Sequence, residues 1–130
     1  MAPAARQGDA VLGTDIHIVL VPTPGGPVAT PTPFPFSAKI TEGCSTNVLI
    51  GGQQAAIVGS TTENEPSHVP ASGTFSVPPT NRGTVMSGSP TVLINGKPAA
   101  RAGDQVMTCN DPAPAPTGVI EAVNTVIIGP

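Results

Sequence analysis

The sequence has very few aromatic and charged residues, and both shortages limit what the protein can be. Only 2% of the 130 residues are aromatic and 10% are charged, with no Trp and no Tyr. A core so poor in large side chains needs another source of stability, such as a metal or a partner. The formal net charge is −3, so the chain lacks the basic surface that binds nucleic acid or anionic membranes.

Targeting segments are also absent from the sequence. No apolar run reaches the ~18 residues of a membrane-spanning helix. No basic segment followed by an apolar one predicts a signal peptide at the N-terminus. We therefore expect synthesis in the cytoplasm, and any export would use another route.

Proline and glycine are abundant instead, with 17 and 15 residues. Val and Ile still recur in short runs bounded by turn residues, which favours many short strands. The clearest unit is residues 91–104, TVLINGKPAARAGD. Its apolar triplet 92–94 predicts a strand, and Asn95-Gly96 predicts a type I′ turn, because both turn positions need φ > 0. Residues 97–102 would form the return strand.

The same unit occurs in two further copies. Residues 48–60, VLIGGQQAAIVGS, form a weaker copy, and residues 119–130, VIEAVNTVIIGP, match residues 85–96 but stop where a return strand should begin. The N-terminal segment 1–9, MAPAARQGD, supplies that missing half. We predict one all-β domain spanning residues 1–130. Its three hairpin repeats would be related by pseudo-three-fold symmetry and closed by pairing of the N- and C-terminal strands, which removes exposed edges. A linear array of repeats is the rival architecture, but it does not explain the split copy.

Residues 22–36 interrupt the repeats with six prolines. This composition predicts an inserted loop of polyproline character. A plain surface loop is the simpler interpretation, and a docking tag is the functional one.

Charged residues at the end of each repeat vary together. Two copies carry an arginine and an aspartate three residues apart, and the third carries neither: Arg6 with Asp9, Arg101 with Asp104, and Ile57 with Ser60. Joint loss of both charges is expected if they form an ion pair. An exposed pair would contribute about 0–1 kcal/mol.

Potential metal ligands occupy comparable places in the repeats. His17, His68 and Cys109 each follow the Gly-Asp or Gly-Ser end of one copy by five to eight residues. One donor per repeat should converge on the pseudo-three-fold axis, with Cys44 as a fourth ligand that breaks the symmetry. Two imidazoles and two thiolates suit a single structural Zn²⁺. The ion would tie three hairpins at one point and stabilise a thin core.

Other interpretations of these residues stay open. A Cys44–Cys109 disulfide would require an oxidising compartment, and two unlinked buried thiols are equally simple. If Cys44 is not a ligand, water could complete an open site of the catalytic kind. No HExxH or HxE…PCxxC pattern supports that, and no spacing favours a Cys/His nucleophilic pair.

Residues 88–104, GSPTVLINGKPAARAGD, resemble the PAAR-repeat family, named for its Pro-Ala-Ala-Arg tetrapeptide. Through the degenerate copies the resemblance covers nearly the whole chain apart from residues 22–36. It implies a small conical β-protein that caps the trimeric spike of type VI secretion systems or related contractile injection machines, including phage-like tails. It also implies a zinc near the vertex, typically bound by three His and one Cys. This chain has two His, so by position a second Cys must stand in.

The resemblance leads us to predict a non-enzymatic spike tip, one chain per trimeric VgrG-type spike, that sharpens the spike for membrane puncture. It would be assembled at the tip of the particle, delivered out of the cell or into the target, and would contact the target membrane transiently. The chain starts at the PAAR motif and ends soon after its last strand, so no effector domain is expected. An adaptor that docks a separate effector is the alternative. A zinc hydrolase using Glu42 or Glu65 is a third possibility.

Strand alternation predicts two faces for the hairpins, because successive side chains point to opposite sides. One set should line the interior, and the other could meet the spike. The two sets are Val48, Ile50, Val92, Ile94, Val126 and Ile128 on one side, and Leu49, Leu93 and Ile127 on the other.

Overall fold

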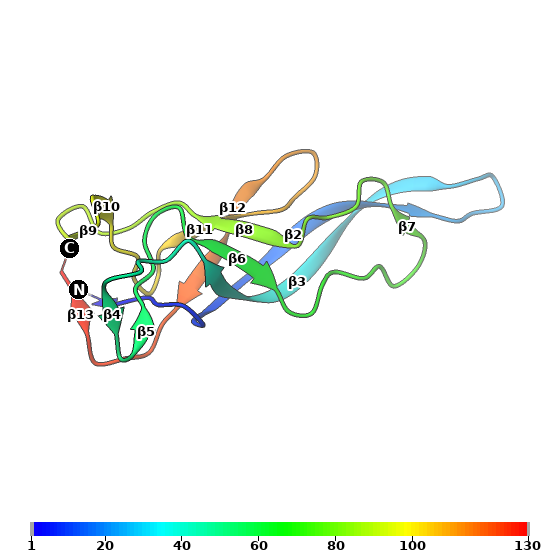
Figure 1. The fold of residues 1–130 in the computed structure, drawn as a ribbon. Helices are drawn as coiled ribbons and strands as arrows, with labels where there is room; N and C mark the ends of the chain where they lie inside the picture. The colour runs from blue at the N-terminus through cyan, green and yellow to red at the C-terminus, as the bar shows by residue number, and fades with distance from the viewer. Residues whose placement is uncertain (1, 130) are drawn as a thin grey trace.

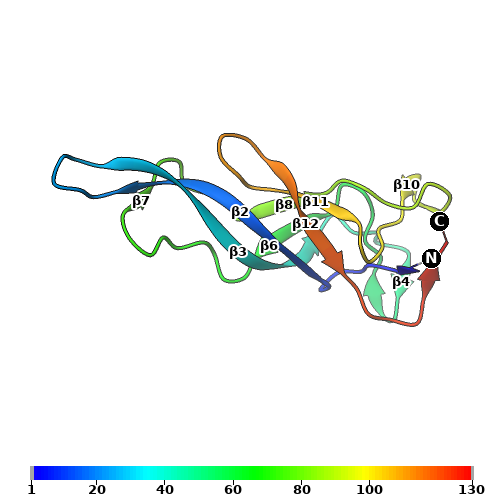
Figure 2. The ribbon, with the colours of Figure 1, turned by 180° about the vertical axis from the view of Figure 1, so that it is seen from behind.

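The computed structural model describes residues 2–129 as an elongated all-β molecule (Figure 1). The described residues form strands, turns and bends but no helix, so none of them forms a helix able to cross a membrane. Both chain ends lie at one end of the molecule, and a long hairpin extends from the opposite end (Figures 1 and 2). The predicted all-β class is confirmed.

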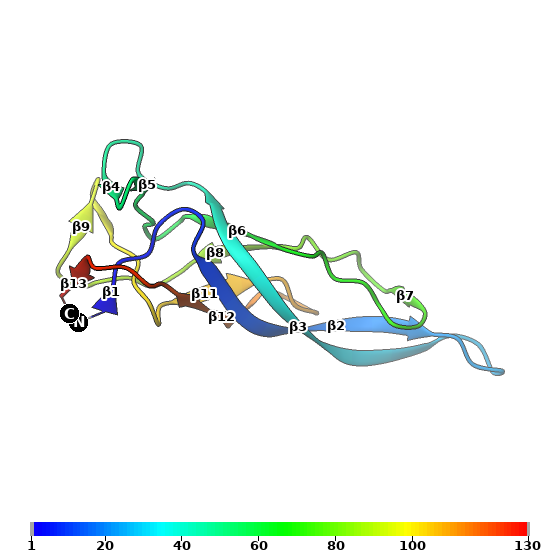
Figure 3. The same ribbon diagram turned by 90° about the horizontal axis from the view of Figure 1, so that it is seen from below.

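Three short hairpins lie at the end that holds both termini (Figure 3). They are β4 (Leu49–Ile50) with β5 (Gln53–Gln54), β9 (Leu93–Ile94) with β10 (Lys97–Pro98), and β13 (Ile127–Ile128) with β1 (Ala2–Pro3). Their registers are equivalent: Leu49 lies opposite Gln54, Leu93 opposite Pro98, and Ile127 opposite Pro3. The last strand therefore pairs with the first, and the predicted ring of three repeats is confirmed.

The two continuous hairpins have the turn chemistry that the sequence predicts. Asn95 and Gly96 have φ of 54° and 81°, and Gly51 and Gly52 have φ of 56° and 87°. Positive φ at both central positions defines the type I′ turn, whose twist matches that of the strands it joins.

The second alanine of each repeat closes a ring of backbone hydrogen bonds around the pseudo-three-fold axis. The amide of Ala5 donates to the carbonyl of Ala100 (2.9 Å), Ala100 to Ala56 (3.0 Å), and Ala56 to Ala5 (3.0 Å). All three side chains are fully buried, as are those of the preceding alanines. Three backbones can approach one axis this closely only where side chains are small, which explains the Ala-Ala pair in every copy.

A larger antiparallel sheet forms the middle of the molecule. Its strands follow the order β12-β11-β8-β6-β3-β2-β7, and a further pairing of β12 with β2 closes six of them into a ring. These strands are β2 (Ala10–Val21), β3 (Val28–Glu42), β6 (Thr61–Asn64), β7 (Thr74–Phe75), β8 (Arg82–Val85), β11 (Gln105–Thr108) and β12 (Ala115–Glu121). Val11, Ile40, Val106 and Ile120 belong to its buried core, which is continuous with the second alanines.

The prediction of a loop over residues 22–36 is wrong for most of that range. Residues 28–36 belong to β3, which pairs with β2 from Val21 opposite Val28 to Ala10 opposite Lys39. Only residues 22–27 connect the two strands. Pro31, Pro33 and Pro35 alternate along β3, so their missing N–H groups all fall on one side of the strand. That side is a free edge here, because β6 pairs only with the later part of β3, and free edges are where strands accept proline.

Candidate metal centre

A cluster of four potential ligands lies at the end of the closed sheet that is away from the alanine ring, just beyond the paired parts of β6 and β11. Asp15 and His17 come from β2, His68 follows β6, and Cys109 directly follows β11. Asp15 and His17 are two residues apart on one strand, so both point to the interior. One ligand atom from each of the four residues lies within 4.8 Å of the others.

The distances within the cluster suit a tetrahedral ion. Cys109 Sγ lies 3.5 Å from Asp15 Oδ2 and 3.6 Å from His17 Nε2, and His68 Nε2 lies 2.7 Å from Asp15 Oδ2. Zinc bonds of about 2.0–2.3 Å place neighbouring ligand atoms roughly 3.3–3.8 Å apart. The sulfur distances fall in that range, whereas Asp15 and His68 are at hydrogen-bonding distance and would separate slightly around an ion.

The cluster is shielded from water. Asp15 is 0% and His17 1% exposed, and the side chain of His68 is 3% exposed. The rings of Phe34 and Phe75 pack on His17 at centroid distances of 5.7 and 5.8 Å. A buried carboxylate is costly unless it is hydrogen-bonded and its charge is paired. Thr108 and Thr117 supply hydrogen bonds to Asp15, and a bound cation would pair its charge.

The pKa of the Cys109 thiol depends on whether a cation is bound. Burial raises the pKa of the Cys109 thiol, and the negative charge of Asp15 raises it further. In the absence of a cation the thiol therefore stays protonated at neutral pH. A bound metal would reverse this balance, because a coordinated thiol is deprotonated. Together, the residues fit a metal that accepts nitrogen, sulfur and oxygen donors.

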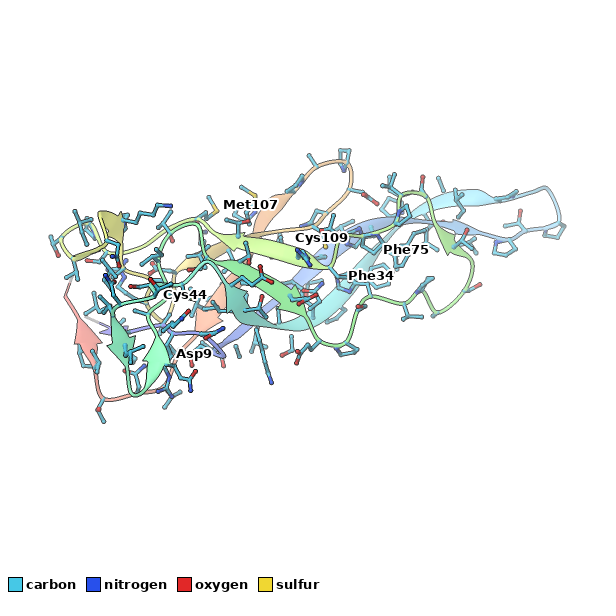
Figure 4. All side chains as sticks on the ribbon, in the orientation of Figure 1. Asp9, Phe34, Cys44, Phe75, Met107 and Cys109 are labelled. Atoms are coloured by element: carbon cyan, nitrogen blue, oxygen red, sulfur yellow. The ribbon has the colours of Figure 1, made fainter. Side chains whose placement is uncertain are left out.

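The structure brings together three of the four residues that the repeats select. His17, His68 and Cys109 converge, but Cys44 does not join them. Cys44 packs against the main core, and Figure 4 shows it well separated from Cys109 along the long axis of the molecule. Both cysteines are free thiols.

The position of Cys44 follows from the repeat itself. Its neighbour Ser45 donates its amide to the carbonyl of Ala55, as Ser89 does to Ala99 in the next copy. Residues that precede the short hairpins are therefore held at the alanine ring. Residues that follow the hairpins run towards the opposite end, where the cluster lies.

The sequence reasoning missed Asp15, because it considered only His and Cys as donors. A signal was present: Asp15-x-His17 places a carboxylate on the same strand face as the predicted ligand. Asp15 takes the place in the cluster that the prediction gave to Cys44.

Fold and cluster together define a small all-β protein of three repeats in a ring, with a buried group of side chains able to bind a metal. A family model described as PAAR motif matches residues 76–130. No curated protein and no solved structure matches the chain. The match covers less than half of the chain, but the degenerate copies at residues 2–9 and 48–60 lie in the same ring, and together these findings support assignment to the PAAR-repeat family. The PAAR motif supports a structural role related to the spike tips of secretion systems.

Proposed function

We propose that the protein caps the trimeric central spike of a contractile injection apparatus, one chain per VgrG-type trimer. The observation that carries the proposal is an exposed apolar residue at the same position of each short hairpin. Leu49 is 61% exposed, Leu93 60% and Ile127 49%. We call these three residues the hairpin face.

The opposite set of strand residues supports this choice of face. Ile50 and Ile128 are only 6% exposed, and Val92 and Ile94 pack against the second buried cluster around the first alanines. Val48 and Val126 directly precede β4 and β13 and are 37% and 43% exposed. Because strand residues alternate between two sides, burial of the isoleucines turns the hairpin face outwards.

Symmetry explains why such a face would suit a trimer. Three equivalent hairpins offer each spike subunit a nearly identical apolar contact, although the tip is a single chain. Fully burying one side chain of this size contributes about 1.5–3 kcal/mol. Three such contacts would give useful affinity even after the cost of association.

The candidate centre would give this tip its mechanical role. One structural Zn²⁺ would join β2, the segment after β6 and the segment after β11, which are far apart in sequence. A cross-link at one point resists separation of the strands when the end beyond it meets a membrane. The protein would act without catalysis, be made in the cytoplasm, travel on the particle, and contact the target membrane transiently.

The structure weakens one argument for the adaptor alternative, namely that residues 22–36 form a loop free to dock an effector. The proposed docking loop is largely strand β3, and residues 28–35 pair with residues 14–21 of β2, the segment that carries Asp15 and His17. Effector binding by another surface stays a prediction.

Binding to a trimeric VgrG-type spike protein tests the cap. We expect Leu49→Asp, Leu93→Asp and Ile127→Asp each to weaken binding about 10- to 100-fold, as loss of one such contact implies. Val119→Asp is the matched control, because Val119 is 45% exposed but lies on β12 in the closed sheet. If the triple variant binds the spike as tightly as the wild type, the hairpin face is not the contact surface.

A further inference from the structure

We infer that Asp15 is the fourth ligand of the metal centre and that a second layer of side chains holds Asp15 and His17 in their ligand orientations. The second layer consists of Thr108, Thr117, Asn110 and Asp111. The inference rests on the proposed metal-binding role of the cluster. It adds the identity of the fourth ligand and the residues that position two of the four.

The two oxygens of Asp15 have different surroundings. Oδ2 faces the cluster, with His68 Nε2 at 2.7 Å and Cys109 Sγ at 3.5 Å. Oδ1 faces away and accepts from the hydroxyl of Thr108 and, at 3.1 Å, from that of Thr117. One oxygen is thus held by protein donors, and the other is directed at the ligand atoms.

Asn110 completes the support of Asp15. Its Nδ2 lies 3.2 Å from Thr108 Oγ1, 3.3 Å from Thr117 Oγ1 and 3.4 Å from Asp15 Oδ1. Each threonine hydroxyl can accept one hydrogen bond while it donates its own proton. Because the Asn110 amide donates to both hydroxyl oxygens, the two hydroxyl protons can be donated to Asp15. The two hydroxyls lie 2.6 Å apart, so the group is compact enough to fix the carboxylate plane.

Asp111 is placed to orient His17. Within residues 2–129, His17 Nδ1 is the buried side-chain nitrogen or oxygen without a hydrogen-bond partner. Asp111 Oδ2 lies 3.6 Å from it, slightly too far for a hydrogen bond. The other nitrogen, Nε2, faces Cys109. When Nε2 gives its lone pair to a cation, Nδ1 carries the proton, and a carboxylate acceptor in this position is the usual second-layer partner of a metal-bound histidine.

The residues that perform these tasks lie in one short segment. Asn110 Oδ1 accepts from the amide of Ile16 (2.6 Å), Asp111 Oδ2 accepts from the amide of Ile18 (2.8 Å), and the amide of Asp111 donates to the carbonyl of Ile16 (2.8 Å). Asn110 and Asp111 thereby bind the edge of β2 at Ile16 and Ile18, on either side of His17. One segment supplies a ligand, supports a second and orients a third.

The test measures Zn²⁺ affinity of the full chain by competition with a chromophoric chelator, together with the absorption spectrum of the Co²⁺-loaded chain. Asp15→Asn keeps the shape of the side chain but weakens its ligand character, so we expect the largest loss of affinity and altered cobalt ligand-field bands. Asp111→Asn and Thr117→Val should weaken affinity about 10- to 100-fold. Their thiolate-to-cobalt band should persist, because Cys109 still binds.

Two controls separate positioning from general destabilisation. Thr117→Ser keeps the hydroxyl and should restore affinity, whereas a purely steric role would not distinguish it from Thr117→Val. Glu63→Gln changes an exposed carboxylate on β6 and should leave affinity unchanged. The unfolding midpoint of each metal-free variant shows whether it folds, and if Asp15→Asn does not fold, Asp15→Glu replaces it.

The outcomes divide between this inference and the proposed function. Wild-type affinity and an unchanged cobalt spectrum in Asp15→Asn, with metal lost in Cys44→Ser, would overturn Asp15 as the fourth ligand. Wild-type affinity in both Asp111→Asn and Thr117→Val would overturn the positioning layer. A wild-type chain that binds no metal would overturn the centre itself, and with it the metal part of the proposed function.

Discussion

The Asp104 carboxylate accepts a backbone hydrogen bond and forms an ion pair, and the variants Asp104→Ser and Asp104→Ala distinguish the contributions of these two contacts to stability. Asp104 Oδ2 accepts from the amide of Arg101 at 2.7 Å, and its oxygens also accept from the Arg101 guanidinium at 3.0 and 3.2 Å. Asp9 and Arg6 repeat this arrangement, with the amide contact at 2.9 Å and the ion pair at 3.6 Å. The predicted ion pairs are thus confirmed.

The middle repeat is a natural version of the serine variant. Ser60 Oγ accepts from the amide of Ile57 at 3.0 Å, so the backbone contact is kept where both charges are lost. Asp104→Ser should likewise keep the hydrogen bond and remove the ion pair. Asp104→Ala should remove both.

The expected magnitudes follow from burial. The Arg101 side chain is 22% exposed, so water screens the pair and its loss should cost about 0–1 kcal/mol. Leaving the partly buried amide without an acceptor should cost about 1–3 kcal/mol more. For a domain of this size, 1 kcal/mol corresponds to a shift of about 3–5 °C in Tm.

Denaturant unfolding with Zn²⁺ held constant measures these differences, because any ligand of the folded state adds its own stabilisation. We expect Asp104→Ala to be clearly less stable than Asp104→Ser. The gap between Asp104→Ser and the wild type should shrink in high salt, which screens charges. If the serine and alanine variants are equally destabilised, the backbone contact is not what the residue contributes.

Three further results are expected. Ala100→Val should destabilise by about 1–3 kcal/mol, because the alanine ring has no space for added methyl groups; an unchanged denaturation midpoint would mean that the ring can expand. Burial raises the pKa of the Cys44 thiol from its ordinary value of 9.0. The contribution of the protonated thiol to folding stability is therefore complete below pH 9.0 and is lost as pH rises through the pKa of the folded state. Unfolding of the zinc-loaded chain should therefore depend less on alkaline pH in Cys44→Ala, and equal pH profiles would contradict this burial. Pro33→Thr should restore an amide donor on the free edge of β3 and promote concentration-dependent association, measured by size-exclusion chromatography with Pro24→Thr in the connecting turn as control; a variant that stays as monomeric as the control would show that proline does not protect this edge.

Much of the architecture could be predicted because it is encoded locally and repeated. The Asn95-Gly96 turn and the alternation around it specify one hairpin, and its copies specify two more. The split copy at the chain ends then requires that the last strand pair with the first. The convergence of His17, His68 and Cys109 followed from the same symmetry, since equivalent positions in a ring face a common axis.

Composition alone was misleading for residues 22–36. Six prolines predict a loop, yet three of them alternate along an unpaired edge of β3. Their lack of N–H groups breaks no hydrogen bond there. Which side of a strand is free depends on where β6 stops pairing with β3, and that is set by the sheet as a whole.

The sequence by itself determined the three hairpins, their ring, and three of the four residues in the cluster, because repetition makes these positions equivalent. The tertiary structure alone decided that Asp15 joins the cluster, that Cys44 stays at the alanine ring, and that Leu49, Leu93 and Ile127 face outwards. These features depend on contacts between segments far apart in the chain, and for the cluster these are the contacts of Asn110 and Asp111 with β2. No local pattern specifies such contacts, because they form only when the closed sheet brings the two segments together.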